Sequence, residues 1–265
     1  MTVRKAAVAG QFYPASPEEI KMMFDHFNKV LEGHLKNPDL LKTKTRAVIV
    51  PHAGYVYSGF TANVAHRLLG NSGVKRVVVI GPSHRVYLQG TSVSEYDLYE
   101  TPLGDLPVDR NFATELISKF GLGFMPDAHY EHSTEVQMPF IKTYLPESRV
   151  VELVYGDENP KNLAPVIEWA LNDSDSGVVI STDLSHYYDI EKAKALDSIC
   201  LDAVSKLDPS ELHRGCEACG KIGVEAMLIA AKNLNLEPLL LDYRTSADAS
   251  GDESQVVGYM SAAFI

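Results

Sequence analysis

The chain has 265 residues, 45% of them hydrophobic and 22% charged, as in ordinary globular proteins, and no apolar segment approaches the length of a membrane span, so we expect no membrane partner. Its formal net charge of -11 repels a phosphate backbone, and without a basic patch we expect no nucleic-acid partner. The 3 cysteines, an odd number, argue against a disulfide framework and for a reducing, cytoplasmic location.

The N-terminal part of the chain predicts alternating helices and buried strands. Residues 7–15 read as an irregular entry segment, and Ser16 is expected to cap the first helix. The expected elements are a helix from Pro17, a strand over 47–50, a helix over 60–70 and a strand over 74–80. Residues 85–107 form a loop-rich region with short strand-like pieces.

The C-terminal part continues this alternation. The expected helices are one capped by Asp109 and running to Phe120, a stretch over 131–145 that Pro139 interrupts, and helices over 164–171, over 190–207, from Pro209, and from Gly220 to Asn233. The expected strands cover 149–155 and 177–181, with closing strands over 237–243 and 256–265. This order predicts the α/β class: one domain, 1–265, built as a three-layer α/β/α sandwich on a mixed, mainly parallel sheet. The two closing strands could pair in antiparallel fashion.

Histidines follow three of the buried strands. The run 47–50 is followed by His52, the run 77–80 by His84, and the run 178–180 by Asp183 and His186. Ligands of open α/β sheets bind at the carboxyl ends of the strands. These residues are therefore the first candidates for a functional site.

His52 and His84 are candidate metal ligands. One buried histidine at a strand end is more often a hydrogen-bonded structural residue, but two after adjacent parallel strands would meet at the same rim of the sheet. Neutral imidazole binds iron, copper and zinc. Cys219 is the best third donor, because the pattern predicts that a helix begins there and a helix N-terminus lowers a thiol pKa. Its alternative role is that of a small buried residue packed behind that helix.

Two other interpretations concern the cysteines. Cys216 and Cys219 have the CEAC spacing of a zinc or redox pair, and His213 could complete a local His/Cys/Cys set, although no second pair is present. Cys200 lies within a helical pattern and is expected in the core.

Asp183 and His186 are candidates for proton transfer. The carboxylate could hold one nitrogen of a nearby imidazole and leave the other free as acid or base. Alternatively, Asp183 caps the following helix. No serine lies in a nucleophile-elbow context, which disfavours a serine hydrolase.

The sequence HYEH contributes His129 and His132, of which His132 is the better candidate for a site. Tyr55 and Tyr57 could wall the site or simply pack at its rim. We expect the remaining helical histidines on the surface: His26, His34 and His66.

Seven short segments, in order along the chain, resemble the Memo family, which includes protein B of the AmmeMemoRadiSam set. They are AVAGQFYPA, VPHAGYVYSG, GPSH, EHSTEVQMPF, STDLSH, the CG of ACGKIGVEA, and VVGYMSAAF. The resemblance spans essentially the whole chain and implies a fold like that of class III extradiol dioxygenases (LigB-like), which hold a non-haem iron with two histidines and a carboxylate.

By this resemblance, His52 and His84 match the metal-binding histidines, and Cys219 stands where dioxygenases place the acidic ligand. His186, beside Asp183, matches the acid/base histidine, and His132 matches a further pocket histidine. Thiolate in place of carboxylate softens the site toward copper or zinc and makes it oxidisable. The resemblance therefore implies a bound iron or copper ion, with zinc as a further option, more strongly than it implies ring cleavage.

Three functions follow from these observations. The first is a metal-dependent redox protein of unknown substrate. The second is a binding or adaptor protein that uses the same pocket for a small molecule or peptide. The third is a partner of a radical SAM enzyme and an AMMECR-type protein in a modification pathway.

Overall fold

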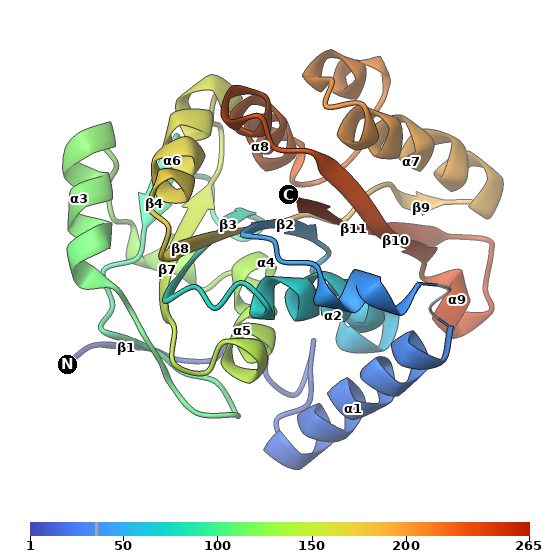
Figure 1. Ribbon diagram of the computed structural model, residues 1–265, viewed down its shortest axis with the longest axis horizontal. Coiled ribbons are helices and arrows are strands. Elements are labelled where there is room, and N and C mark those ends of the chain that lie inside the picture. Colours follow the sequence, from blue (N-terminus) through green and yellow to red (C-terminus); the bar gives the residue numbers. More distant parts are fainter. Residues whose placement is uncertain (35–36) are drawn as a thin grey trace.

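The fold is built on one large sheet, seen nearly edge-on in the centre of Figure 1. The computed structural model describes residues 1–34 and 37–265. The strand order is β10-β11-β2-β8-β3-β7-β4, and β9 pairs with β11 beside this path. Its strands are β2 (Ala47–Val50), β3 (Arg76–Pro82), β4 (Thr91–Val93), β7 (Arg149–Tyr155), β8 (Ser176–Ser181), β9 (His186–Tyr188), β10 (Pro238–Thr245) and β11 (Val256–Phe264).

The four strands β2, β8, β3 and β7 are parallel, whereas β4, β9, β10 and β11 pair in antiparallel fashion. The β10/β11 pair is the antiparallel closing pair of the sequence prediction. A second, three-stranded sheet joins β1 (Val3–Arg4), β5 (Leu98–Tyr99) and β6 (Leu106–Pro107).

Helices cover both faces of the large sheet (Figure 1). One layer contains α3 (Arg110–Phe120), α6 (Pro160–Asn172), α7 (Ile190–Ser205) and α8 (Lys221–Leu234). The other contains α1 (Pro17–His34), α2 (Tyr55–Gly70), α4 (His132–Glu135) and α5 (Met138–Tyr144). Shorter helical segments are η1 (Pro38–Lys42), η2 (Pro126–His129), η3 (Pro209–Arg214) and α9 (Ala247–Ser250).

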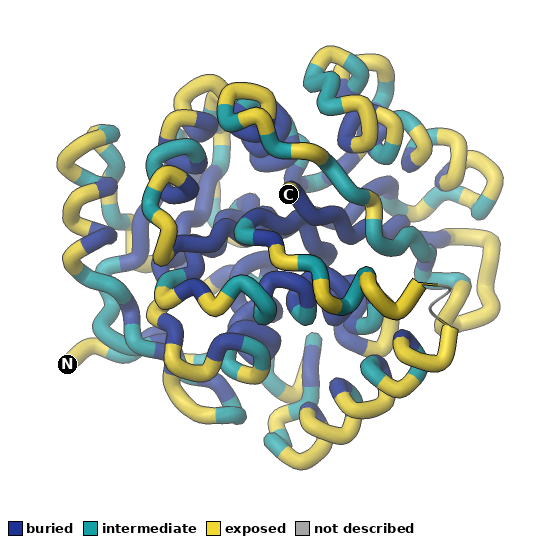
Figure 2. The backbone as a smooth tube through the Cα atoms, in the orientation of Figure 1, coloured by how far each residue is buried: buried dark blue, intermediate teal, exposed yellow. Residues whose placement is uncertain are grey.

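Alternating side chains of the strands create two cores. Ile49 and Ile80 pack with α3, α6 and α8, whereas Val48 and Val79 pack with α1, α2 and α5. Both cores are buried, as the dark strands of Figure 2 show. Because successive residues of a strand face opposite sides, wholly apolar strands require cover on both. The predicted three-layer α/β/α sandwich is confirmed.

Several boundaries differ from the prediction. Helix α2 begins at Tyr55 rather than Phe60, directly after Gly54, and the helix expected from Pro209 is a 3₁₀ segment. The interruption expected at Pro139 is confirmed, because α4 ends at Glu135 and α5 restarts at Met138. The short strand β9 was not predicted. No helix in the described part of the chain is long and apolar enough to cross a membrane.

The cysteine count argued against a disulfide framework, but the structure contains a disulfide. Cys200 on α7 is bonded to Cys216, 16 residues along the chain, and Cys219 remains the free thiol. Counting cysteines cannot reveal such a pair, because the packing of the segment after η3 against α7 brings the two Cα atoms within 5.1 Å. The cysteine argument for a reducing compartment therefore no longer holds.

Candidate metal centre

The candidate site lies at the carboxyl ends of β2, β8 and β3. The expectation that the strands before His52 and His84 are neighbours is wrong, since β8 lies between them. Their side chains nevertheless meet above the end of β8, where the ring centroids of His52 and His84 are 5.1 Å apart. The order of parallel strands depends on how the helical crossovers pack, which local sequence patterns do not record.

A third imidazole joins these two. His132, the first residue of α4, has its ring centroid 4.6 Å from that of His84 and 5.4 Å from that of His52. One nitrogen from each ring lies within 4.8 Å of the others, a spacing at which the three could hold a metal ion. His52 is buried, whereas the His84 side chain is 31% exposed, so the group can be reached from solvent.

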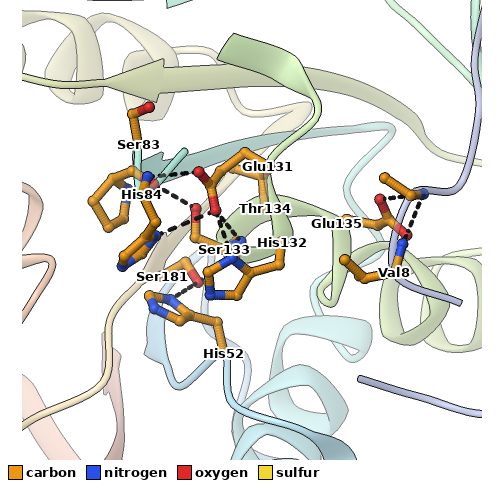
Figure 3. A network of polar contacts seen from close by, with 12 residues as sticks. Val8, His52, Ser83, His84, Glu131, His132, Ser133, Thr134, Glu135 and Ser181 are labelled. Atoms are coloured by element: carbon orange, nitrogen blue, oxygen red, sulfur yellow. Dashed lines mark hydrogen bonds and ion pairs between the residues drawn. The ribbon is translucent and has the colours of Figure 1, made fainter. Parts of the chain in front are cut away.

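Glu131 anchors two of the three rings (Figure 3). Its Oε1 lies 2.7 Å from Nδ1 of His132 and 3.2 Å from Nδ1 of His84, and its Oε2 accepts from the His84 main-chain N–H at 2.6 Å. Burial alone would raise the pKa of this carboxyl, but the hydrogen bonds from His132 and His84 outweigh burial and hold the pKa well below its usual range. An ionised carboxylate only accepts hydrogen bonds, so both rings donate to it from Nδ1–H, and Nε2 is the ring nitrogen available to a metal.

Sequence reasoning missed Glu131. The available signal was its position directly before His132, where it also caps α4 by accepting from the Ser133 N–H at 3.2 Å. A helix-capping residue adjoining a candidate ligand is well placed to orient that ligand.

His52 is held by the end of β8 and the loop that follows it. Its main-chain N–H donates to Oδ1 of Asp183 at 2.7 Å, and its Nδ1 lies 2.9 Å from Oγ of Ser181. Burial lowers the pKa of His52 well below its usual value, and the neighbouring His84 and His132 contribute smaller shifts in the same direction. The ring is therefore neutral, which is the form that binds metals.

Cys219 lies beside this ring, immediately before Gly220, the N-cap of α8. Its Sγ is 3.2 Å from Nε2 of His52 and accepts from the Asp183 N–H at 3.3 Å. The expected lowering of its pKa is wrong: burial, reinforced by the Asp183 carboxyl, raises the pKa of the thiol to about 12. The thiol is thus protonated without a metal, and a metal that bound the sulfur would have to replace that proton.

Asp183 and His186 both lie at the end of the sheet near the histidine group. Oδ2 of Asp183 is 4.0 Å from Nε2 of His52. Burial raises the pKa of this carboxyl, although the hydrogen bond from the His52 main-chain N–H lowers it in part. His186, half-buried on β9, is close enough for its charge to lower the same pKa. Helix α7 is capped by Asp189, so Asp183 is not its cap.

Two other candidate histidines are not part of the histidine group. His129 is buried between Glu152 Oε2, at 2.8 Å from its Nδ1, and Ser92 Oγ, at 2.7 Å from its Nε2. His213 pairs with Glu225 at 3.2 Å with its side chain 60% exposed.

The local His/Cys/Cys set is not formed, because Cys216 is in the disulfide. Tyr55 is buried and donates to the Val136 carbonyl, whereas Tyr57 is 46% exposed. The expectation that His66 lies on the surface is wrong, since it is only 1% exposed. Helix α2 is buried on most sides, so the position of His66 on a helix could not show whether its side chain is exposed.

The residues present fit a metal ion. Three imidazoles, each with Nδ1 engaged by an oxygen, form the anchored donor set typical of histidine-based metal sites. Cys219 adds a soft donor at the edge of this set. His132 thus provides a nitrogen donor in addition to the expected thiol.

Comparison with known proteins agrees with the motifs. Residues 4–263 match the family described as Memo-like protein. The chain is 35% identical to a MEMO1 family protein of Aquifex aeolicus, with all of both chains covered. It is 34% identical to a MEMO1 family protein of Methanopyrus kandleri, with 98% of each covered, and 33% identical to one of Archaeoglobus fulgidus, with 99% of each covered. The chain therefore belongs to the Memo-like protein family.

Proposed function

We propose that this Memo-family chain is a metal-dependent redox protein that binds iron or copper and acts on a substrate not yet identified. The observation that carries the proposal is the convergence of three imidazoles, each anchored through Nδ1, beside a free thiol. Histidine nitrogen suits iron, copper and zinc, and thiolate shifts the preference toward softer metals. A redox-active ion supplies one-electron chemistry that the side chains themselves lack.

The proposed ligands are His52, His84 and Cys219, with His132 as the additional nitrogen donor. His186 is the proposed acid or base, and Asp183 is the proposed neighbouring group that assists it. Burial raises the pKa of the Asp183 carboxyl, and the nearby imidazoles oppose that shift. Partial exposure of His84 gives a substrate access to the metal side of the site.

The test is metal binding by protein purified without oxygen. Ferrous iron, cuprous copper and zinc are each titrated into metal-free protein, and bound metal is measured by elemental analysis. Electron paramagnetic resonance follows after oxidation of bound iron or copper to the ferric or cupric ion. We expect one equivalent in the wild type and loss of binding in a His52→Ala/His84→Ala variant. His213→Ala, which removes an exposed histidine outside the site, is the matched control and should bind normally. Wild-type protein that stays metal-free with all three ions would refute the proposal.

A second candidate is an adaptor that binds a peptide or small molecule at the same site. Exposed Tyr57 and Tyr187 favour it, because exposed aromatic side chains are enriched in recognition surfaces. A pull-down with wild type and the double-histidine variant separates the candidates: an adaptor retains its partners without the metal ligands. A radical SAM enzyme among the captured proteins would instead support the modification-pathway proposal.

A further inference from the structure

A line of buried polar groups runs behind His52 from helix α2. It begins at His66, whose Nε2 lies 2.9 Å from Oε1 of Gln137. The amide nitrogen of Gln137 donates to the Pro51 carbonyl at 2.9 Å and to Oγ of Ser181 at 3.0 Å. His66, Gln137 and Ser181 are all buried, so none of these groups can exchange its partner for bulk water.

The line ends at the metal site. The Ser181 hydroxyl lies 2.5 Å from the Ser133 carbonyl and 2.9 Å from Nδ1 of His52 (Figure 3). Its oxygen therefore has three polar neighbours: a carbonyl, an amide nitrogen and an imidazole nitrogen.

Two main-chain carbonyls determine the direction of every hydrogen bond in this line. A carbonyl can only accept, so Gln137 turns its amide nitrogen toward Pro51, and Ser181 directs its single hydroxyl proton to Ser133. Oε1 of Gln137 then accepts from His66, where burial lowers the pKa to about 4 and keeps the ring neutral. With its proton committed to Ser133, Ser181 can only accept from the remaining neighbours.

We propose that Ser181 is a positioning residue that holds His52 as the Nδ1–H tautomer and so leaves Nε2 unprotonated toward the site. Gln137, itself oriented by His66 and Pro51, helps to hold the Ser181 hydroxyl in this arrangement. The value of this arrangement for metal binding rests on the proposed function. The tautomer itself is a property of the metal-free protein.

Removal of the Ser181 hydroxyl reverses the balance between the tautomers. Nδ1–H would then face a buried space without its acceptor, which disfavours that form. Nε2–H would find acceptors nearby, because Oδ2 of Asp183 is 4.0 Å away and Sγ of Cys219 is 3.2 Å away. The favoured tautomer would then have a proton on the nitrogen that a metal needs.

The experiment measures the His52 tautomer directly, by long-range ¹H–¹⁵N correlation spectra of metal-free, ¹⁵N-histidine-labelled protein. We expect the wild type to show Nδ1–H and Ser181→Ala to shift His52 to Nε2–H. Zinc alone then serves as the binding probe, and its affinity should fall about 10- to 100-fold in Ser181→Ala. Ser148→Ala is the matched control, because it removes a buried serine hydroxyl that donates to the Leu145 carbonyl at the opposite end of the sheet.

An unchanged His52 tautomer in Ser181→Ala would overturn the inference, whatever the zinc affinity. A shift of equal size in Ser148→Ala would also overturn it. If the wild type takes up no metal but Ser181→Ala still changes the tautomer, the positioning role stands and the proposed function fails.

Discussion

Substitution of Glu131 by glutamine tests the anchoring of two ligands by one carboxylate. The Glu131 carboxylate faces four N–H groups, from the His84 main chain, the His84 and His132 rings and the Ser133 main chain. An amide of the same shape has only one accepting atom. In either orientation, its NH₂ group therefore meets at least one of these donors.

The expected cost follows from that conflict. Loss of an acceptor for a buried, charge-assisted hydrogen bond destabilises a protein by roughly 1.5–3 kcal/mol, so we expect Glu131→Gln to lower the free energy of unfolding by about 2–4 kcal/mol. Because two rings lose their orientation together, metal affinity should fall by about 100-fold, the upper end for a residue that orients ligands. Urea denaturation measures the first effect, and competition with a chromophoric chelator measures the second.

Glu152→Gln is the matched control. Glu152 is also a buried carboxylate with a lowered pKa, and it accepts from His129, Tyr99 and Thr134, none of which is a proposed ligand. It should lower stability comparably without changing metal affinity. Folded Glu131→Gln protein with wild-type affinity, or an equal loss of affinity in Glu152→Gln, would refute the anchoring argument.

Three further predictions concern groups whose surroundings the structure revealed. Replacement of Cys200 and Cys216 by serine opens a loop of 16 residues. It should lower the free energy of unfolding, measured by urea titration, by about 3 kcal/mol, and an unchanged free energy of unfolding would contradict this. Because burial raises the pKa of Cys219 to about 12, metal-free native protein at pH 8 should react with iodoacetamide much more slowly than unfolded protein, and equal rates would show that the thiol is not protected. Burial lowers the pKa of His66 from 6.5 to about 4. Between these two pH values the unfolded chain therefore binds more protons than the folded protein, and the free energy of unfolding should fall by about 3 kcal/mol as the pH falls from the upper value to the lower. His66→Phe, which can stack on Phe140 as His66 does, should flatten this part of the pH profile, and a profile identical to that of wild type would rule out His66 as its source.

Local patterns in the sequence were sufficient to predict the parallel strands, the helices between them and the histidines at the strand ends. An apolar run that ends at proline or glycine predicts a buried strand and its end from neighbouring residues alone, as in the segment from Ala47 to His52. The family motifs then connected His52, His84 and Cys219, which lie far apart in the chain.

Only the tertiary structure placed β8 between β2 and β3 and thereby put Ser181 behind His52. It also showed that Glu131 holds two imidazoles and that Cys200 is bonded to Cys216. The physical reason is the same in each case. Hydrophobic periodicity reports whether a residue faces a core, whereas hydrogen-bond and disulfide partners depend on which distant segments the packed helices bring to the same end of the sheet.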